Sequence, residues 1–304
     1  MFRQATIRTG ARLHCGLFAP GSRTGRQHGG VGLMIDAPGF ILRATRSNVE
    51  RIQGDPYWCE RISRLLSHYP VGNPQPWDPP TLHWEVVQAI PPHSGLGSGT
   101  QLGLAVAKIL SSLRGEPELE TTELARRSGR GLRSAVGLHG FSLGGLLLEG
   151  GKEADAGISP LISRVAIPHD WRFVLMRPIG GSGLSGTEEQ QGFARLGSMP
   201  VAATDRLCRL AVMDLIPAAI EANFSRFSAA LDEYGGVVGD YFAPVQGGVY
   251  ADPALRRLVP RLRAKGYAGI AQSSWGPTLF VCCSNAALAQ QLVAELEADA
   301  DCRH

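Results

Sequence analysis

The run Pro91-Pro92-His93-Ser94-Gly95-Leu96-Gly97-Ser98-Gly99-Thr100 stands where a strand-like segment gives way to a helical one. Apolar residues then recur at helical spacing until Gly115, which ends the helix. Gly95, Gly97 and Gly99 have no side chains, so the backbone there can approach an anion closely. The free N–H groups and the positive dipole end of the following helix favour the same anion. The sequence therefore predicts a phosphate-binding loop at the start of a helix.

This loop differs from the two best-known nucleotide-binding patterns. No Gly-Lys-Ser/Thr ends it, so it is not a Walker loop. Its third glycine is misplaced for a dinucleotide fingerprint, and no acidic residue closes a following strand at the required distance. The glycines alone also fit a turn without a ligand. Two roles are open to Ser98 and Thr100: their hydroxyls cap the helix, or they contact a phosphate or its bound Mg²⁺.

The 304-residue chain is long enough for about two domains of roughly 150 residues each. Hydrophobic residues make up 44% of it and charged residues 19%, which is typical of a globular protein. The net charge of +3 is mild and the arginines are scattered, so we expect no nucleic-acid partner. The N-terminal segment has no apolar core of a secretory signal peptide, and the sequence has no eighteen-residue apolar run. We therefore expect a cytoplasmic protein without a membrane partner. The six cysteines lack CxxC spacing, which argues for buried thiols rather than a zinc cage or disulfides.

The N-terminal half is predicted to begin with β-strands and to continue with helices. The expected elements are strands at 5–18, 29–46 and 81–87, a proline-rich surface loop at 69–80, the helix after the glycine loop, and a helix at 121–129. Thr121 or Thr122 is expected to cap the last of these.

The C-terminal half is predicted to be an α+β sandwich, because strands stand on both sides of a run of helices. The expected elements are a strand at 172–176, a second glycine-rich loop at 178–186, helices at 204–216, 218–234 and 252–265, strands at 268–274 and 278–283, and a closing helix at 285–297. Asp252 and Asn285 are expected to cap the last two helices. We place the domain boundary before the first of these strands, which gives domains at 1–168 and 169–304.

The glycine loop resembles the phosphate-binding signature of the GHMP kinases, written Pro-x-x-x-Gly-Leu-Gly-Ser-Ser/Gly. More narrowly, the chain resembles the β-ribofuranosylaminobenzene 5′-phosphate synthases, a GHMP-fold family that begins the methanopterin side arm. Four blocks carry this resemblance: residues 12–17 with 29–33, 92–101, 129–145, and 272–278. The Gly-Ser-Gly-Thr-Gln ending of the loop and the Gln-Ser-Ser-Trp-Gly-Pro-Thr block are far more specific than the glycines.

The resemblance implies an α+β, two-domain, GHMP-kinase-like fold. Its N-terminal domain would be ribosomal protein S5 domain 2-like, and its C-terminal domain a ferredoxin-like α/β sandwich. The implied activity is that of a transferase that joins phosphoribosyl pyrophosphate to 4-aminobenzoate and releases pyrophosphate and CO₂. We expect Mg²⁺ as a cofactor, a homodimer as the assembly, and small molecules as the other partners.

This chemistry assigns roles to residues within the matching blocks. The leaving pyrophosphate needs cationic donors, so Arg130 or Arg133 is expected to bind it, and whichever of the two does not could hold the acceptor carboxylate instead. These two arginines and His93 are the expected catalytic residues. The expected phosphate-binding residues are Ser94, Gly95, Leu96, Gly97, Ser98, Gly99 and Thr100. The expected aromatic-acid-binding residues are Arg12, His14, Ser274 and Trp275, the last by stacking on the ring. Solvated arginines, core histidines and a core tryptophan are the structural alternatives.

Two rival functions and several residue roles stay open. Many GHMP kinases carry a catalytic aspartate in the segment that aligns with 129–145, which here holds no acidic residue. An ATP-dependent small-molecule kinase is therefore the second hypothesis, and a non-catalytic sensor of a phosphate ligand is the third. The acceptor is either 4-aminobenzoate or 4-hydroxybenzoate. Glu188 and Glu189 fit either the family's Gly-Leu-x-Gly-x-x-Glu stretch or a helix start, and Asp36 fits a turn better than a metal ligand.

Overall fold

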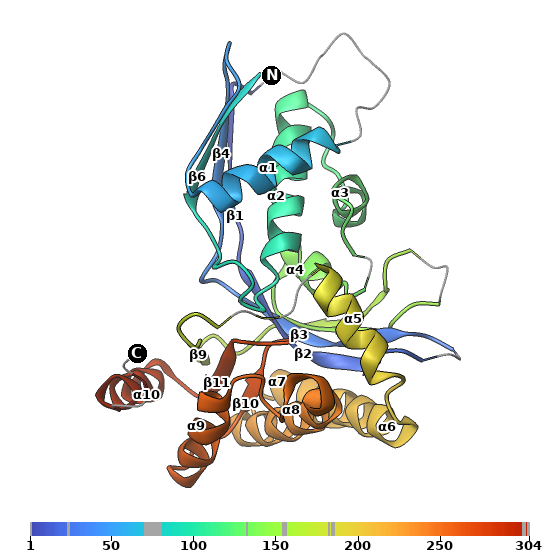
Figure 1. Ribbon diagram of the computed structural model, residues 1–304, viewed down its shortest axis with the longest axis vertical. Helices are drawn as coiled ribbons and strands as arrows, with labels where there is room; N and C mark the ends of the chain where they lie inside the picture. The colour runs from blue at the N-terminus through green and yellow to red at the C-terminus, as the bar shows by residue number, and fades with distance from the viewer. Residues whose placement is uncertain are drawn as a thin grey trace.

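The computed structural model describes residues 2–22, 25–69, 81–131, 133–153, 157–181, 183, 186–299 and 302. These residues form an α+β fold with three sheets (Figure 1). Two four-stranded sheets belong to the N-terminal half and one three-stranded sheet belongs to the C-terminal half. This architecture confirms the predicted α+β fold class.

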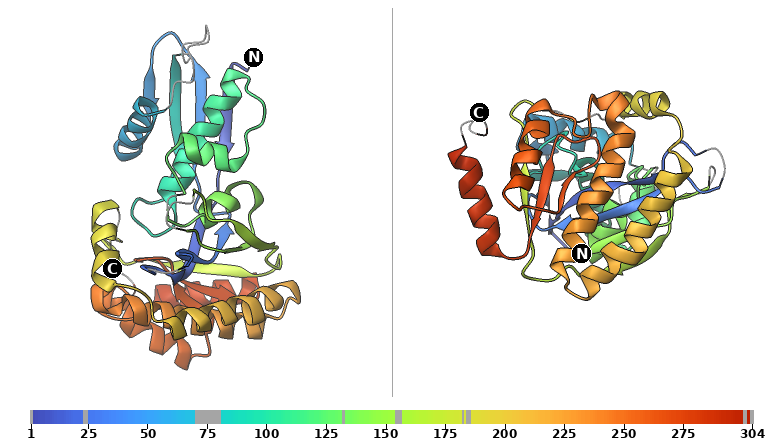
Figure 2. Two further views of the ribbon diagram at one scale, coloured as in Figure 1. Left: turned by 90° about the vertical axis from the view of Figure 1, so that its right-hand side faces the viewer. Right: turned by 90° about the horizontal axis from the view of Figure 1, so that it is seen from below.

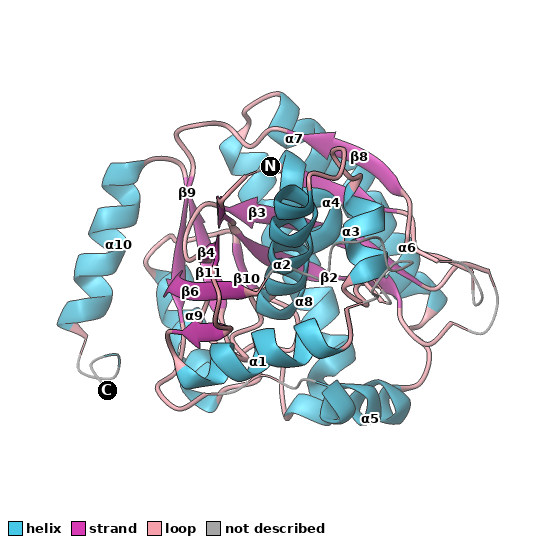
Figure 3. Ribbon diagram, turned by 90° about the horizontal axis from the view of Figure 1, so that it is seen from above, coloured by secondary structure: helices cyan, strands magenta, loops and turns pink. Residues whose placement is uncertain are grey.

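The first sheet has the strand order β1-β4-β6-β5. Its strands are β1 (Gln4–Arg8), β4 (Ile41–Arg46), β5 (Arg51–Gln53) and β6 (Leu82–Gln88), and all pairs are antiparallel except β5 with β6. Helices α1 (Pro56–Ser67) and α2 (Ser98–Arg114) pack on this sheet. Seen from above, α2 runs through the centre of the molecule (Figure 3). Its apolar side chains join the buried Phe40 and Trp84 in the main core.

The second sheet has the order β2-β3-β7-β8 and is antiparallel throughout. Its strands are β2 (Ala11–Ala19), β3 (His28–Ile35), β7 (Leu146–Glu149) and β8 (Leu161–Val165). Helices α3 (Thr121–Arg127) and α4 (Val136–Leu143) connect α2 to this sheet. Alternation along β2 sends Leu13 and Cys15 into the core and turns Arg12 and His14 toward the opposite side. That alternation is what brings two polar residues of a buried strand to one site.

The C-terminal half combines the sheet β10-β11-β9 with a layer of helices. The strands are β9 (Arg172–Met176), β10 (Ile270–Gln272) and β11 (Leu279–Cys283). The helices are α5 (Gly186–Leu196), α6 (Val201–Leu210), the π-helical turn η1 (Ala211–Leu215), α7 (Ile216–Ile220), α8 (Phe224–Gln246), α9 (Pro253–Ala264) and α10 (Ala286–Ala298). Figure 2 shows α6 to α8 as a layer beneath the strands. The Tyr234 hydroxyl of α8 donates to the Gly16 carbonyl of β2 over 3.0 Å, which ties this layer to the second sheet.

Several predicted element boundaries are confirmed by the structure. The side chain of Asp252 accepts a hydrogen bond from the Ala254 N–H at the start of α9, and Asn285 accepts one from Leu288 at the start of α10. Gly115 takes a left-handed conformation (φ 70°) at the end of α2, as a helix-ending glycine should. Strand 172–176 is β9.

Other boundaries were wrong or missed. Neither Thr121 nor Thr122 caps α3, because Glu120 holds the cap position and makes no side-chain hydrogen bond there. The helices expected at 204–216 and 218–234 are instead a helical run from 201 to 220 and a longer α8, separated near Ala222, which has a positive φ of 53°. Helices α1, α4 and α5 were not predicted. The loop at 69–80 lies outside the described residues beyond Tyr69, as do 182, 184 and 185 of the second glycine-rich loop.

The predicted boundary between 168 and 169 falls between β8 and β9, which belong to different sheets. The division into domains stays a prediction. No helix in the described ranges is both long and apolar enough to cross a lipid bilayer. Cys15, Cys282 and Cys283 are buried, whereas Cys59, Cys208 and Cys302 are partly exposed.

Candidate active site

A cavity of about 510 Å³ lies where α1, the glycine loop, β2 and α5 meet. Its lining comes from both halves of the chain, since Phe242 of α8 and Ser274 before β11 join residues of the N-terminal half. Twelve of the fourteen residues that the sequence assigned to the site line this cavity: Arg12, His14, His93, Ser94, Gly95, Gly97, Ser98, Gly99, Thr100, Arg130, Arg133 and Ser274. Leu96 and Trp275 are buried outside it.

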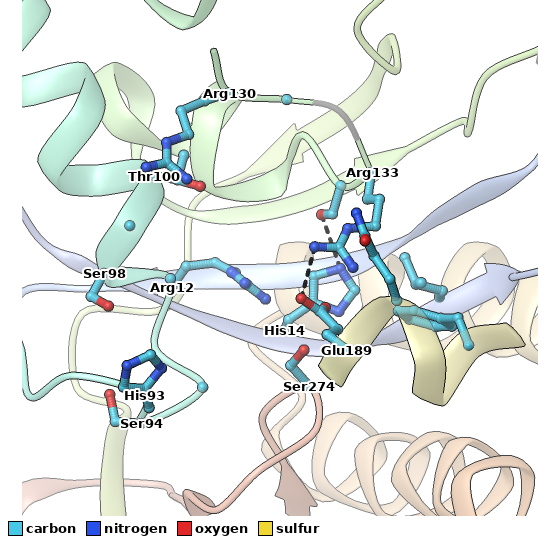
Figure 4. Close-up of a pocket in the computed structure, with 18 of the residues that line it drawn as sticks. Arg12, His14, His93, Ser94, Ser98, Thr100, Arg130, Arg133, Glu189 and Ser274 are labelled. Carbon is cyan, nitrogen blue, oxygen red and sulfur yellow. Dashed lines mark hydrogen bonds and ion pairs between the residues drawn. The ribbon is translucent and has the colours of Figure 1, made fainter. Parts of the chain in front are cut away.

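The labelled side chains form two groups inside the cavity (Figure 4). Arg130, Thr100, Ser98, Ser94 and His93 surround the start of α2, and Arg133, His14, Glu189 and Ser274 lie together at the other end. The Arg12 side chain extends between the two groups. This arrangement would fit a ligand, or a pair of ligands, with an anionic group at the start of α2 and a second polar group at the other end of the cavity.

The glycine loop has the geometry expected of an anion site. Gly97 is the N-cap of α2 in a left-handed conformation (φ 73°), and no side chain caps the helix. In the described part of the chain, the backbone N–H groups of Ser98 and Gly99 make no hydrogen bond, while those of Thr100 and Gln101 both reach the Gly97 carbonyl. The capping role left open for Ser98 and Thr100 is therefore not used. Unpaired N–H groups and the helix dipole both face the cavity.

The Gln-Ser-Ser-Trp-Gly-Pro-Thr block fixes this loop in place. The Ser273 hydroxyl donates to the Gly95 carbonyl over 2.7 Å, and the Thr278 hydroxyl donates to the Ser94 carbonyl over 2.7 Å. An added Cβ at Gly95 would lie 2.6 Å from the Ser273 carbonyl oxygen, so only glycine fits this close approach. The block also reaches β2, because the Ser273 hydroxyl accepts from the His14 N–H over 3.0 Å. Its main contribution is to hold the loop and β2 together.

Four arginines line the cavity, and most of their charge is unpaired. Within the described ranges, the guanidinium groups of Arg12, Arg61 and Arg130 make no ion pair and no hydrogen bond. Arg133 pairs with Glu189 of α5 over 2.8 Å, although its Nη1 atom is buried without a partner. Burial lowers the pKa of Arg130, as does the nearby Arg61, and burial also lowers the pKa of Arg12. Such crowded, desolvated cations favour a polyanionic ligand.

Glu189 is the carboxylate that lines the cavity, whereas Glu188 is exposed. Of the two interpretations of this pair, the structure supports a site role for Glu189 alone. Burial raises the pKa of Glu189, and the charges of Arg133 and Arg12 partly offset that rise. A carboxylate already paired with an arginine is a poor base for activating a hydroxyl group.

Glu149 is a buried acid that the sequence analysis missed. It ends β7 with no exposed surface and accepts hydrogen bonds from the Ser134 hydroxyl (2.7 Å) and the Ala135 N–H (2.6 Å). The Ser134 hydroxyl oxygen in turn lies 3.0 Å from Nε2 of His14. Burial alone would raise the pKa of Glu149, but its bonds to His14, Ser134 and Ala135 keep it low. A lone acid at the end of an apolar strand was the available signal, because a buried carboxylate needs partners.

Trp275 does not stack against the cavity as predicted. It is only 3% exposed and packs behind two phenylalanine rings, with its ring centroid 4.2 Å from that of Phe242 and 5.1 Å from that of Phe193. Those two rings line the cavity in its place. The Arg133 guanidinium lies 6.0 Å from the centre of the Phe193 ring. A flat aromatic acid would therefore meet Phe193 and Phe242 rather than Trp275.

The described residues contain no group of three or more His, Cys, Asp or Glu side chains suited to a metal ion. Asp36 does not line the cavity. Among the described lining residues, the hydroxyl oxygens in the glycine loop are those of Ser94, Ser98 and Thr100, of which Ser94 already donates to the Pro91 carbonyl over 2.7 Å.

Comparison with known families matches both halves of the chain. Residues 60–144 match the GHMP kinases N terminal domain, and residues 215–301 match GHMP kinases C terminal. The β-ribofuranosylphenol 5′-phosphate synthase of Archaeoglobus fulgidus is 32% identical over 241 residues, which cover 74% of this chain and 73% of that protein. The chain belongs to the β-ribofuranosylphenol 5′-phosphate synthase family. The synthase of the same name from Methanothermobacter thermautotrophicus is 26% identical over 92% of this chain and 89% of its own length.

The resemblance stated from the sequence is thus confirmed, and this member of the β-ribofuranosylphenol 5′-phosphate synthase family has the GHMP fold. The phosphomevalonate kinase of Streptococcus pneumoniae has a TM-score of 0.70 with it at 14% identity, covering 98% of this chain and 97% of that one. Similarity at that identity shows the fold alone. Among the described residues that line the cavity of this family member, the carboxylate is that of Glu189. It is paired with Arg133, so it is not free to act as a carboxylate base in phosphoryl transfer.

Proposed function

We propose that this protein transfers the 5-phosphoribosyl group of phosphoribosyl pyrophosphate to the ring of a 4-substituted benzoate, with release of pyrophosphate and CO₂. The observation that carries the proposal is a cavity with four arginines and an uncapped helix start, in a chain whose relatives are named for a β-ribofuranosylphenol 5′-phosphate product. Within the methanopterin pathway this would be a transferase step.

The donor would occupy the end of the cavity at the glycine loop. Its phosphate oxygens would accept hydrogen bonds from the N–H groups of Ser98 and Gly99. They would also accept hydrogen bonds from the guanidinium groups of Arg12, Arg61 and Arg130. Arg130 lies along the first turn of α2, since a Cβ at Gly99 would be 3.4 Å from its Nη1 atom. These cations stabilise the charge that grows on pyrophosphate as it leaves. His93, whose Nε2 lies 3.0 Å from the Tyr57 hydroxyl, borders the same end.

The acceptor would occupy the other end, with its ring against Phe193 and Phe242. Its carboxylate would be held by Arg12, whose side chain extends between the two groups and so can contact both the carboxylate and the donor phosphates (Figure 4). In this pose the ring carbon that bears the carboxylate faces the ribose.

The reaction needs one bond to form and two to break. The bond between ribose C1 and pyrophosphate breaks with its electron pair on the leaving oxygen, and the substituted ring carbon bonds to C1. The bond to the carboxylate then breaks, its electron pair returns to the ring, and CO₂ leaves. No group in the cavity has to remove a proton from the reacting carbon. The carboxylate base that many GHMP kinases use has no free counterpart among the described lining residues, because Glu189 is paired with Arg133.

Magnesium remains part of the proposal. Mg²⁺ prefers oxygen ligands and keeps several waters, so it would be held by the pyrophosphate oxygens with the hydroxyls of Ser98 and Thr100 nearby. It would neutralise charge on the leaving group. A cytoplasmic location and a homodimer also stay predictions.

Carboxyl-labelled acceptor tests the proposed reaction. Purified protein with phosphoribosyl pyrophosphate and Mg²⁺ should release one labelled CO₂ and one pyrophosphate for each product molecule. The acids to compare are 4-hydroxybenzoate, which gives the phenol of the relatives' name, and 4-aminobenzoate. Retention of the label with phosphate transfer from ATP would instead identify a kinase. Ligand binding without turnover would identify a sensor.

A further inference from the structure

Glu149, Ser134 and His14 form a continuous hydrogen-bonded chain from the core to the cavity. Both carboxylate oxygens of Glu149 accept hydrogen bonds, one from the Ser134 hydroxyl and one from the Ala135 N–H. Because Ser134 donates its proton to Glu149, its oxygen is left to accept from Nε2–H of His14 over 3.0 Å. The tautomer follows from this network. Nδ1 of His14 is therefore the nitrogen with a free lone pair.

His14 is held rigidly, and that lone pair is unused. Its backbone N–H donates to the Ser273 hydroxyl and its carbonyl accepts from the Ser274 N–H, both over 3.0 Å. The ring lines the cavity, and none of the described residues forms a hydrogen bond with Nδ1. An acceptor atom at the cavity wall that has no protein partner is open to a donor group of a ligand.

The charge state suits a proton acceptor better than the carboxylate clamp predicted for His14. Burial lowers the pKa of His14, and the nearby Arg12 and His28 lower it further, while Glu149 raises it. The ring is accordingly neutral at pH 7. A neutral imidazole offers no charge to a carboxylate, and Arg12 already provides a cation for that purpose.

We propose that His14, oriented by Ser134 and Glu149, accepts the proton of the 4-hydroxyl group of a hydroxybenzoate acceptor through Nδ1. His14 is then a catalytic residue, and Ser134 and Glu149 are positioning residues. This inference rests on the proposed function and extends it by naming the group that activates the acceptor.

The chemistry follows from the position of the hydroxyl group, which is para to the carbon that carries the carboxylate. When the hydroxyl proton moves to Nδ1, the oxygen electron pair pushes density onto that carbon and strengthens its attack on ribose C1. The ring becomes a dienone until CO₂ leaves and returns its electron pair. The phenol oxygen then takes the proton back from His14, so the base is regenerated and no other reactant is needed. The imidazolium formed in between is stabilised by Glu149 through Ser134.

The decisive experiment compares acceptors of different phenol acidity in the full chain. His14→Gln removes the base but keeps a polar side chain, and CO₂ release is followed with 4-hydroxybenzoate and with 3,5-difluoro-4-hydroxybenzoate. We expect kcat with 4-hydroxybenzoate to fall by about 100-fold or more. The difluoro acid loses its proton without help, so it should lose about tenfold less activity than the parent acid. His139→Gln is the matched control, because His139 bonds to the Ser159 carbonyl away from the cavity.

Each outcome has a separate meaning. Equal losses with both acids in a folded His14→Gln variant would overturn the role of His14 and leave the proposed function standing. No CO₂ from the wild-type protein with any of these acids would overturn the proposed function itself. If His14→Gln does not fold, Glu149→Gln answers the question through its pH profile.

The pH profile distinguishes positioning from mere structural support. Neutral His14 is the active form, so kcat/KM for 4-hydroxybenzoate should fall as the pH drops through the lowered pKa of His14, below its ordinary value of about 6.5. Burial of the ring lowers this pKa most, and the charged or titratable groups that also act on it are Glu149 on β7, Arg12 on β2 and His28 on β3. Glu149→Gln removes the group that raises the pKa, so the acid limb should move to lower pH while kcat falls. An unmoved limb in a folded, active Glu149→Gln variant would contradict the relay.

Discussion

Replacing Gly97 with valine should remove the binding of phosphoribosyl pyrophosphate while leaving a folded protein. A Cβ at this position would lie 3.0 Å from Nε of Arg12 and 3.2 Å from its Cβ atom, so a branched side chain displaces this arginine. It would also cover the N–H groups at the start of α2. The loss of one desolvated charge contact costs about 2–5 kcal/mol. We therefore expect affinity to fall by about 100-fold or more.

Gly115→Val is the matched control for this variant. Gly115 ends the same helix with nearly the same φ, 70° against 73°, but a Cβ there meets nothing within 4 Å. Both variants carry a similar backbone strain of about 1–2 kcal/mol, and only the first touches the cavity. Melting temperature and affinity for phosphoribosyl pyrophosphate are measured for both. Equal affinities in the two folded variants would remove the glycine loop from the substrate site.

Replacing Arg130 should reduce affinity for phosphoribosyl pyrophosphate without weakening the free protein. Arg130 is desolvated, its Nε atom is buried without a partner, and Arg61 repels it. Arg130→Met removes the charge and should lower affinity by about 100-fold, since a buried anion contact is lost. Arg130→Lys keeps the charge but loses the planar fork, and we expect about a tenfold loss.

Stability separates this role from a structural one. Because the free protein holds the Arg130 charge without a partner, Arg130→Met should melt at the wild-type temperature or above it. Arg126→Lys serves as a control, since Arg126 is exposed on α3, pairs with Glu123 and should change affinity less than about twofold. A marked drop in melting temperature with unchanged affinity in Arg130→Met would show that this arginine supports the fold instead.

The elements with local signals were the ones that the sequence predicted correctly. The glycine loop opens α2, and the Asp252 and Asn285 side chains begin α9 and α10 through bonds to residues two and three positions away. Helix α1 had the same kind of signal, Asp55 followed by Pro56, and was overlooked. The run 201–220 stays helical although it contains Pro217, so its end depends on tertiary packing that no local pattern records.

The site was predicted only in part, because only some of its residues carry a local signal in the sequence. Glycines and arginines grouped in blocks marked the anion end of the cavity, whereas Phe193 and Phe242 reach the other end from helices far along the chain. Trp275 stands inside a matching block, yet the fold buries it behind those rings. The role of Glu149 became visible only when Ser134 and His14 were seen beside it, because the three come from the segment before α4 and from two strands that do not pair with each other, β2 and β7.

The hydroxyls of Ser273 and Thr278 have a consequence for how this chain can be divided. A fragment ending at residue 168 would keep every residue of the phosphate loop but lose the two donors that fix the carbonyls of Ser94 and Gly95. It would also lose the contact that holds the His14 backbone. The catalytic apparatus thus depends on both ends of the polypeptide. During synthesis, the phosphate loop and the His14 backbone gain these partners only after residues 273–278 have been made.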